Sequence, residues 1–117
     1  MKIAVTAQGQ DEQAAVDPRF GRARWFVVVD TDGGEATAVD NSVNLNATQG
    51  AGVQAAKTVA DLGVAAVITG HVGPKAFSAL RAAGVRVFTG AAGTVAQAVR
   101  QFQDGALSEA AEADTET

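Results

Sequence analysis

The sequence contains no cysteine, only 2 prolines, and a single histidine among its 117 residues. The absence of cysteine excludes disulfides, thiolate zinc sites, iron–sulfur clusters ligated by cysteine, and cysteine nucleophiles. No apolar run approaches the roughly 18 residues of a membrane span. Residues 1–8 are also too polar to contain the apolar core of about 7–15 residues that a secretory signal needs. We therefore expect a cytoplasmic protein.

The negative charge is concentrated at the end of the chain. The whole sequence has 13 acidic and 9 basic residues and a net charge of −4. Residues 104–117 contain no base and five of the acids, which are Asp104, Glu109, Glu112, Asp114 and Glu116. Without them the body has 8 acids and 9 bases, so it does not repel anions. We expect one domain over residues 1–105, followed by an acidic, disordered tail over residues 106–117.

The residue pattern predicts an α/β fold. Apolar runs predict strands, and helical spacing with flanking Gly or Pro predicts helices. The expected strands cover residues 2–7, 25–30, 35–41, 64–69 and 85–89, and the expected helices cover 49–62, 74–83 and 94–103. The alternating second half implies parallel strands, whereas the Asp32–Gly34 turn implies a hairpin. The sheet should therefore be mixed, with helices on its faces.

A basic loop is the first candidate site. Residues 17–25 carry three arginines, Arg19, Arg22 and Arg24, beside the aromatic residues Phe20 and Trp25. Guanidinium groups suit anionic ligands, and aromatic rings suit stacking. The alternative is a solvated loop whose aromatic residues are anchored in the core.

A glycine–histidine turn is the second candidate. Gly70, His71 and Gly73 follow a predicted strand and precede a helix that starts at Pro74. Ligands of open α/β sheets bind at strand carboxyl ends, and helix N-termini favour anions. His71 could ligate a metal or donate to an anion, and Lys75 could assist. One histidine cannot complete a structural zinc site, and His71 could instead cap backbone groups of the turn.

The third candidate, residues 48–52 at the start of the first expected helix, favours close helix packing over phosphate binding. It lacks the Gly-Lys-Ser/Thr of a phosphate-binding loop. It also lacks the third glycine, at the right spacing, of a dinucleotide-binding motif, and no strand immediately precedes it. Catalytic patterns are absent as well. The sequence has no nucleophile elbow and no credible acid–base pair, and residues 2–7 carry none of the carboxylates of a two-metal nuclease.

Taken together, the motifs resemble the dinitrogenase iron–molybdenum cofactor biosynthesis family over about residues 1–107. They are Asp17-Pro18-Arg19-Phe20-Gly21-Arg22-Ala23, Gly50-Ala51-Gly52, Gly70-His71-Val72-Gly73-Pro74-Lys75-Ala76-Phe77, Ala83-Gly84-Val85-Arg86-Val87 and Asp104-Gly105-Ala106-Leu107. The resemblance implies a ribonuclease-H-like three-layer fold with about five strands in a mixed sheet and helices on both faces. It also implies binding of an anionic iron–sulfur or iron–molybdenum cofactor or precursor. Arg19 stands where nitrogenase-associated members carry histidine, so this loop lacks a soft nitrogen donor.

The prediction is a small, non-enzymatic protein of metallocofactor biosynthesis that binds a metallocluster or a small anionic ligand. The expected cofactor-binding residues are Arg19, Phe20, Gly21, Arg22, Gly70, His71 and Gly73, with His71 as the metal ligand. Cofactor-assembly proteins are the expected macromolecular partners, and neither a membrane nor a nucleic acid is expected. The alternative is a phosphate- or nucleotide-binding regulatory module. A nuclease is a third hypothesis that rests on the fold alone.

Overall fold

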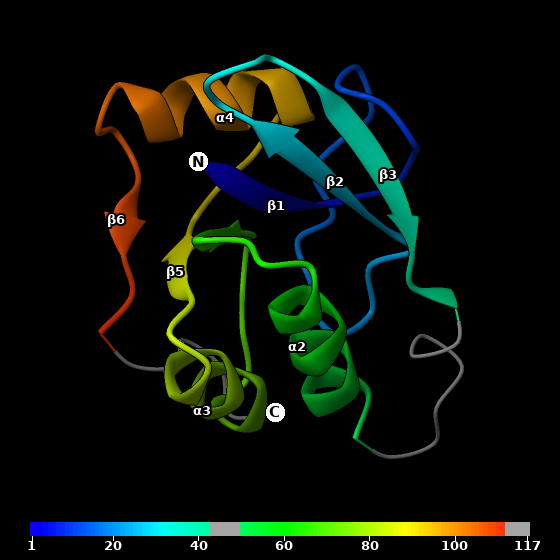
Figure 1. Ribbon diagram of the computed structural model, residues 1–117, viewed down its shortest axis with the longest axis vertical. Helices are drawn as coiled ribbons and strands as arrows, with labels where there is room; N and C mark the ends of the chain where they lie inside the picture. Colours follow the sequence, from blue (N-terminus) through cyan, green and yellow to red (C-terminus); the bar gives the residue numbers. More distant parts are fainter. Residues whose placement is uncertain (43–49, 112–117) are drawn as a thin grey trace.

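The computed structural model describes residues 1–42 and 50–111, which form a six-stranded mixed sheet and three helices. The strand order across the sheet is β3-β2-β1-β4-β5-β6 (Figure 1). The strands are β1 (Lys2–Ala7), β2 (Trp25–Asp30), β3 (Ala36–Asp40), β4 (Ala66–Ile68), β5 (Arg86–Thr89) and β6 (Ser108–Glu109). The helices are α2 (Ala51–Asp61), α3 (Pro74–Ala82) and α4 (Val95–Gln103).

The helices lie on both faces of the sheet and give three layers. Helices α2 and α3 pack side by side on one face, and α4 covers the other (Figure 1). Each face has its own apolar core, because alternate residues of a strand point to opposite sides. Ile3 and Val5 of β1 pack toward α4, whereas Ala4 packs toward α2 and α3. The three-layer α/β expectation is confirmed.

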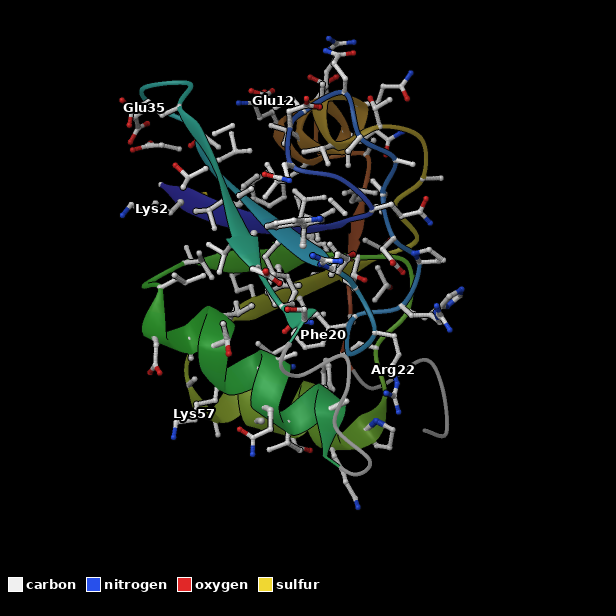
Figure 2. The ribbon with its side chains drawn as sticks, turned by 90° about the vertical axis from the view of Figure 1, so that its right-hand side faces the viewer. Lys2, Glu12, Phe20, Arg22, Glu35 and Lys57 are labelled. Carbon is white, nitrogen blue, oxygen red and sulfur yellow. The ribbon has the colours of Figure 1, made fainter. Side chains whose placement is uncertain are left out.

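The topology gathers the carboxyl ends of three strands at one edge. Strand β4 is parallel to both β1 and β5, while β2 is antiparallel to β1. The segments that follow β1 and β4 therefore emerge at the same edge. These segments are the basic loop and the glycine–histidine turn. In Figure 2, Arg22 lies at this end of the molecule, and Glu35 of the β2–β3 hairpin lies at the opposite end.

The sheet has one strand more than the five expected. Strand β6 falls inside the segment interpreted from the sequence as tail, so residues 106–111 depart from that expectation. Two polar residues give no recognisable strand pattern. Strand β6 is instead recognised by its tertiary contacts: it pairs with β5, the Ala110 N–H donates to the Val87 carbonyl over 2.8 Å, and Arg86 Nη2 donates to Glu109 Oε1 over 2.6 Å. Residues 112–117, the rest of the predicted tail, lie outside the described residues.

The three helices start in different ways. Thr94 caps α4 with a complete capping box, in which its hydroxyl accepts the Gln97 N–H and the Gln97 side chain accepts the Thr94 N–H. Helices α2 and α3 have glycine caps, Gly50 and Gly73, without a side-chain cap and without an acid in the first turn. Their N-terminal N–H groups are thus left for other partners. None of the helices in the described ranges is long and apolar enough to cross a membrane.

Candidate functional site

Backbone hydrogen bonds join the basic loop to the glycine–histidine turn. Arg19 and His71 form a parallel bridge between the two segments. The His71 N–H donates to the Pro18 carbonyl over 2.7 Å, and the Phe20 N–H donates to the His71 carbonyl over 3.2 Å. Two regions that the sequence analysis treated as separate candidates therefore form one structural unit.

A buried polar cluster holds the start of the basic loop in place. The Thr6 hydroxyl at the end of β1 donates to the Asp17 carbonyl over 2.7 Å and lies 2.9 Å from the Thr69 hydroxyl. The Asp17 side chain is 6% exposed, and its carboxylate accepts the Arg19 N–H over 3.0 Å. Sequence reasoning missed this cluster. Its only signal in the sequence is a threonine near the end of each of two strands, Thr6 in β1 and Thr69 after β4. These strands are neighbours in the sheet.

Two glycines allow the backbones of the site to approach closely. A Cβ atom on Gly70 would lie 2.7 Å from Pro18 Cα, and one on Gly21 would lie 2.9 Å from Gly52 Cα. Contacts this short are not tolerated, so the loop can sit against the turn and against the start of α2 only because these residues lack side chains. Gly70 is buried and acts through backbone packing.

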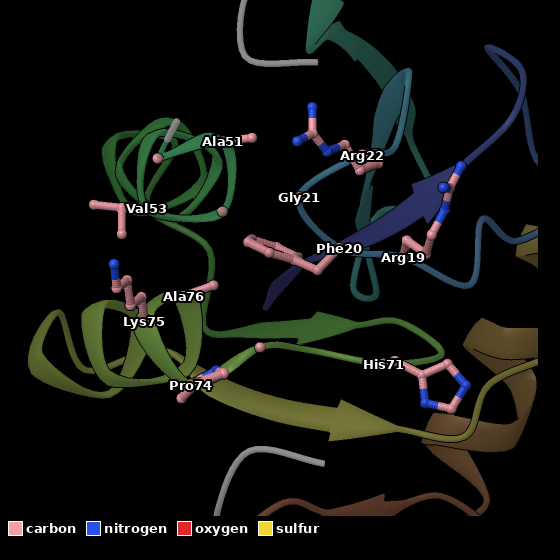
Figure 3. A pocket seen from close by; sticks show the side chains of 13 residues that line it. Arg19, Phe20, Gly21, Arg22, Ala51, Val53, His71, Pro74, Lys75 and Ala76 are labelled. Carbon is pink, nitrogen blue, oxygen red and sulfur yellow. The ribbon is translucent and has the colours of Figure 1, made fainter. Parts of the chain in front are cut away.

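The unit closes one side of an open pocket of about 480 Å³. The lining residues are Arg19, Phe20, Gly21, Arg22, Gly50, Ala51, Gly52, Val53, His71, Gly73, Pro74, Lys75 and Ala76 (Figure 3). Every predicted cofactor-binding residue except Gly70 is in this set. The ring of Phe20, 1% exposed, packs in the core with Ala55, Ala76 and Leu80. The aromatic residue of the loop is thus anchored, as the alternative interpretation expected, while its neighbours line the pocket.

The described lining of the pocket is electropositive. Helices α2 and α3 both begin at its wall, so two helix dipoles direct their positive ends at it. Arg19, Arg22 and Lys75 add cationic side chains, and among the described residues none of those in the lining is acidic. In Figure 3, Val53 and Lys75 lie on one side of Phe20, and Arg19 and His71 lie on the other. An anion in this pocket can be held from several directions by N–H groups and side-chain cations.

Residues 50–53 and 74–76 extend the site beyond the residues first expected. The sequence favours a packing role for residues 48–52, of which 48 and 49 lie outside the described residues. The structure gives residues 50–52 that role, since Gly52 lies against Gly21, and also places them in the pocket wall. Lys75 lines the pocket as well. The signal that would have found these residues is the pair of helix starts without a side-chain cap or an acid.

Arg24 does not take part in the pocket. Its Nε lies 3.6 Å from the Asp40 carboxylate, and its guanidinium stacks over the Trp25 ring at 5.1 Å. Of the three arginines of the loop, only Arg19 and Arg22 line the pocket.

The described residues offer no closed metal site. Within residues 1–42 and 50–111, no group of three or more His, Asp or Glu side chains could hold a metal ion together. His71 is exposed at the pocket wall and would supply one protein ligand at most. A metal complex bound here must bring the remainder of its ligands with it.

Comparisons with known proteins agree with this architecture. The family model described as dinitrogenase iron–molybdenum cofactor matches residues 1–105. The apo form of the orange protein from Desulfovibrio gigas is 48% identical, with a TM-score of 0.95 over 97% of this chain and 96% of that one. A candidate NifB protein from Thermotoga is 33% identical, with a TM-score of 0.86 over 99% and 98% of the two chains. An uncharacterized protein of Methanocaldococcus jannaschii is 29% identical over 92% of this chain and 89% of its own.

Proposed function

The chain belongs to the dinitrogenase iron–molybdenum cofactor family, and from that premise we propose that it binds and carries an anionic iron–sulfur or iron–molybdenum cofactor or precursor. The observation that carries the proposal is the 480 Å³ pocket with two helix N-termini, three cationic side chains and no acid in its lining. Its volume falls in the range of about 300–1,000 Å³ that is common for small-ligand sites.

The chemistry of the pocket suits a preformed metal–sulfur anion. Sulfide and oxygen atoms at the surface of such a complex accept hydrogen bonds from N–H groups and guanidinium groups. The absence of cysteine means that no thiolate of this chain replaces a ligand of the complex. Binding by hydrogen bonds and charge, with His71 as the one possible protein ligand, suits a carrier that must release its cargo.

We infer a carrier without catalysis from the chemistry of the lining. The part of the lining that the structure describes has no carboxylate and no thiol, so it offers none of the usual pairs for acid–base or nucleophilic chemistry. The similar orange protein was solved as an apo form, a term for a protein without its ligand. The candidate NifB relative supports cofactor-assembly proteins as the partners to which the cargo passes.

The proposal is tested by anaerobic titration with isolated iron–molybdenum cofactor and with a synthetic iron–sulfur cluster, followed by visible absorption. We expect saturable binding at one site per chain. Arg19→Gln and Lys75→Gln should each weaken it about tenfold, the effect of losing one exposed charge-assisted hydrogen bond. The matched control is Lys57→Gln, an exposed lysine of α2 outside the lining. Saturation that none of the lining variants changes would contradict the proposed site.

A second candidate, a phosphate- or nucleotide-binding regulatory module, is favoured by the two helix N-termini alone. Thermal unfolding with inorganic phosphate, ATP and the cluster separates the two functions. Stabilisation by the cluster and not by ATP supports the carrier. Stabilisation by ATP, without any spectral change on cluster addition, supports the regulatory module.

A further inference from the structure

The two edge strands of the sheet differ in how they are protected against pairing. At one edge, β6 is two residues long, and Arg86 holds its Glu109 side chain. At the other edge, β3 is five residues long and contains neither Pro nor Lys. It pairs with β2 in continuous register, without a bulge. Natural edge strands usually carry such features because an open edge templates further pairing.

The outer edge of β3 presents a regular row of unpaired backbone groups. The Asn41 N–H donates to the Arg24 carbonyl, and the Asp30 N–H donates to the Glu35 carbonyl. In an antiparallel pair, every second residue bonds to its partner strand, so residues 35, 37, 39 and 41 bond to β2. The N–H and C=O groups of Ala36, Ala38 and Asp40 therefore point outward. Among the described residues, no strand pairs with them (Figure 1).

We propose that β3 pairs antiparallel with β3 of a second copy of this chain, about a two-fold axis at Ala38. This register places Ala38 opposite Ala38 of the second copy, and Ala36 opposite Asp40. All three outward-facing residues then form hydrogen-bonded pairs, each exchanging two bonds. The same surface meets itself, as a closed dimer requires.

The side chains are compatible with this register. Ala36, Ala38 and Asp40 share one face of the sheet with their β2 partners, while Thr37 and Val39 share the other. Thr37 would lie opposite Val39 of the second copy, a favourable β-branched pair. Asp40 would face Ala36, so no like charges meet directly.

A shallow groove beside the edge gives the second copy more surface to cover. It has a volume of about 210 Å³ and is lined by Lys2, Val28, Asp30, Glu35, Thr37, Val39 and Leu62. Val28 and Val39 are only half-buried there. No β3 residue lines the electropositive pocket, so the proposed pairing uses none of its residues. The inference is therefore independent of the proposed function.

The test measures mass against concentration by sedimentation equilibrium for the full chain. We expect the mass to rise from 11.8 kDa toward twice that value. Ala38→Lys and Ala38→Glu should each abolish the rise, because like charges would meet at the axis, and an equimolar mixture of the two should restore it. The matched control is Ala82→Lys, an exposed position of α3, which should dimerise like the unchanged chain.

Amide exchange gives a second readout that does not depend on any variant. The N–H groups of Ala36, Ala38 and Asp40 should become protected as the concentration rises, while that of Thr37, already bonded to β2, should not change. A mass that stays at 11.8 kDa up to millimolar concentration overturns the proposal. A dimer that persists in Ala38→Lys, or whose protected amides lie elsewhere, overturns it as well.

Discussion

Replacing Gly70 by alanine should separate the basic loop from the glycine–histidine turn. Gly70 does not have a positive φ, so an alanine can adopt its backbone conformation without strain. The added Cβ would instead lie 2.7 Å from Pro18 Cα and 2.8 Å from the Pro18 carbonyl oxygen. Both are backbone atoms, so no side-chain rotation relieves the contact. The basic loop must move away from the turn.

The magnitude follows from the bonds that cross this contact. The two hydrogen bonds between Pro18, Phe20 and His71 are the ones that a displaced loop would lose. At about 0.5–1.5 kcal/mol each, their loss costs roughly 2 kcal/mol of unfolding free energy. That figure agrees with the usual cost of about 1–3 kcal/mol for overpacking a buried position. In a chain of this size it lowers Tm by about 10 °C.

Urea and thermal unfolding of Gly70→Ala measure this effect, and a cluster titration measures its consequence for binding. The control is Gly33→Ala, since Gly33 has no positive φ and a Cβ there would meet nothing within 4 Å. Gly33→Ala should leave the unfolding free energy unchanged or raise it slightly, because alanine lowers the conformational entropy of the unfolded chain. If Gly70→Ala had the same unfolding free energy and the same affinity for the cluster as Gly33→Ala, the argument that the loop approaches the turn too closely for a Cβ atom would be refuted.

Three further predictions concern single contacts. Thr94→Ala should lower the unfolding free energy by about 1 kcal/mol, measured in urea, because α4 loses its capping box. Gly21→Ala should weaken cluster binding more than Gly52→Ala, measured by titration, because its Cβ meets the α2 backbone at 2.9 Å, whereas that of Gly52 meets only the Ala76 side chain at 3.1 Å. The Arg86 hydrogen bond lowers the pKa of Glu109 below its ordinary value of 4.5, so its stabilisation is present above pH 4.5 and is lost as the pH falls through the lowered pKa. Glu109→Gln should therefore be less stable than the unchanged chain at pH 7 and equal to it at strongly acidic pH in urea titrations.

The sequence predicted an element correctly where residues at its own boundary determine where it begins or ends. Proline at the start of α3, threonine before α4 and the glycine turn after β2 each mark a boundary that the structure has. Strand β6 could not be predicted, because its two polar residues form no local pattern and its contacts are with β5, where Arg86 bonds to Glu109 from 23 residues away along the chain. The same limit applies to the site. Nothing local separates Arg24, which turns to Asp40, from Arg19, which lines the pocket.

The acids of the β2–β3 hairpin lie too far from the pocket to repel an anion there. Asp30 and Asp32 pair with the amino terminus at 3.6 and 2.7 Å, near the hairpin end. Figure 2 places Glu35 at that end and Arg22 at the opposite one. Charges screen over about 8–10 Å at physiological ionic strength, which is less than the 34 Å length of the molecule. An approaching anion therefore responds to the lining of the pocket and not to the acids of the hairpin. Raising the salt concentration should weaken binding of a cluster, whereas removing acids at the hairpin by Glu35→Gln should leave it unchanged.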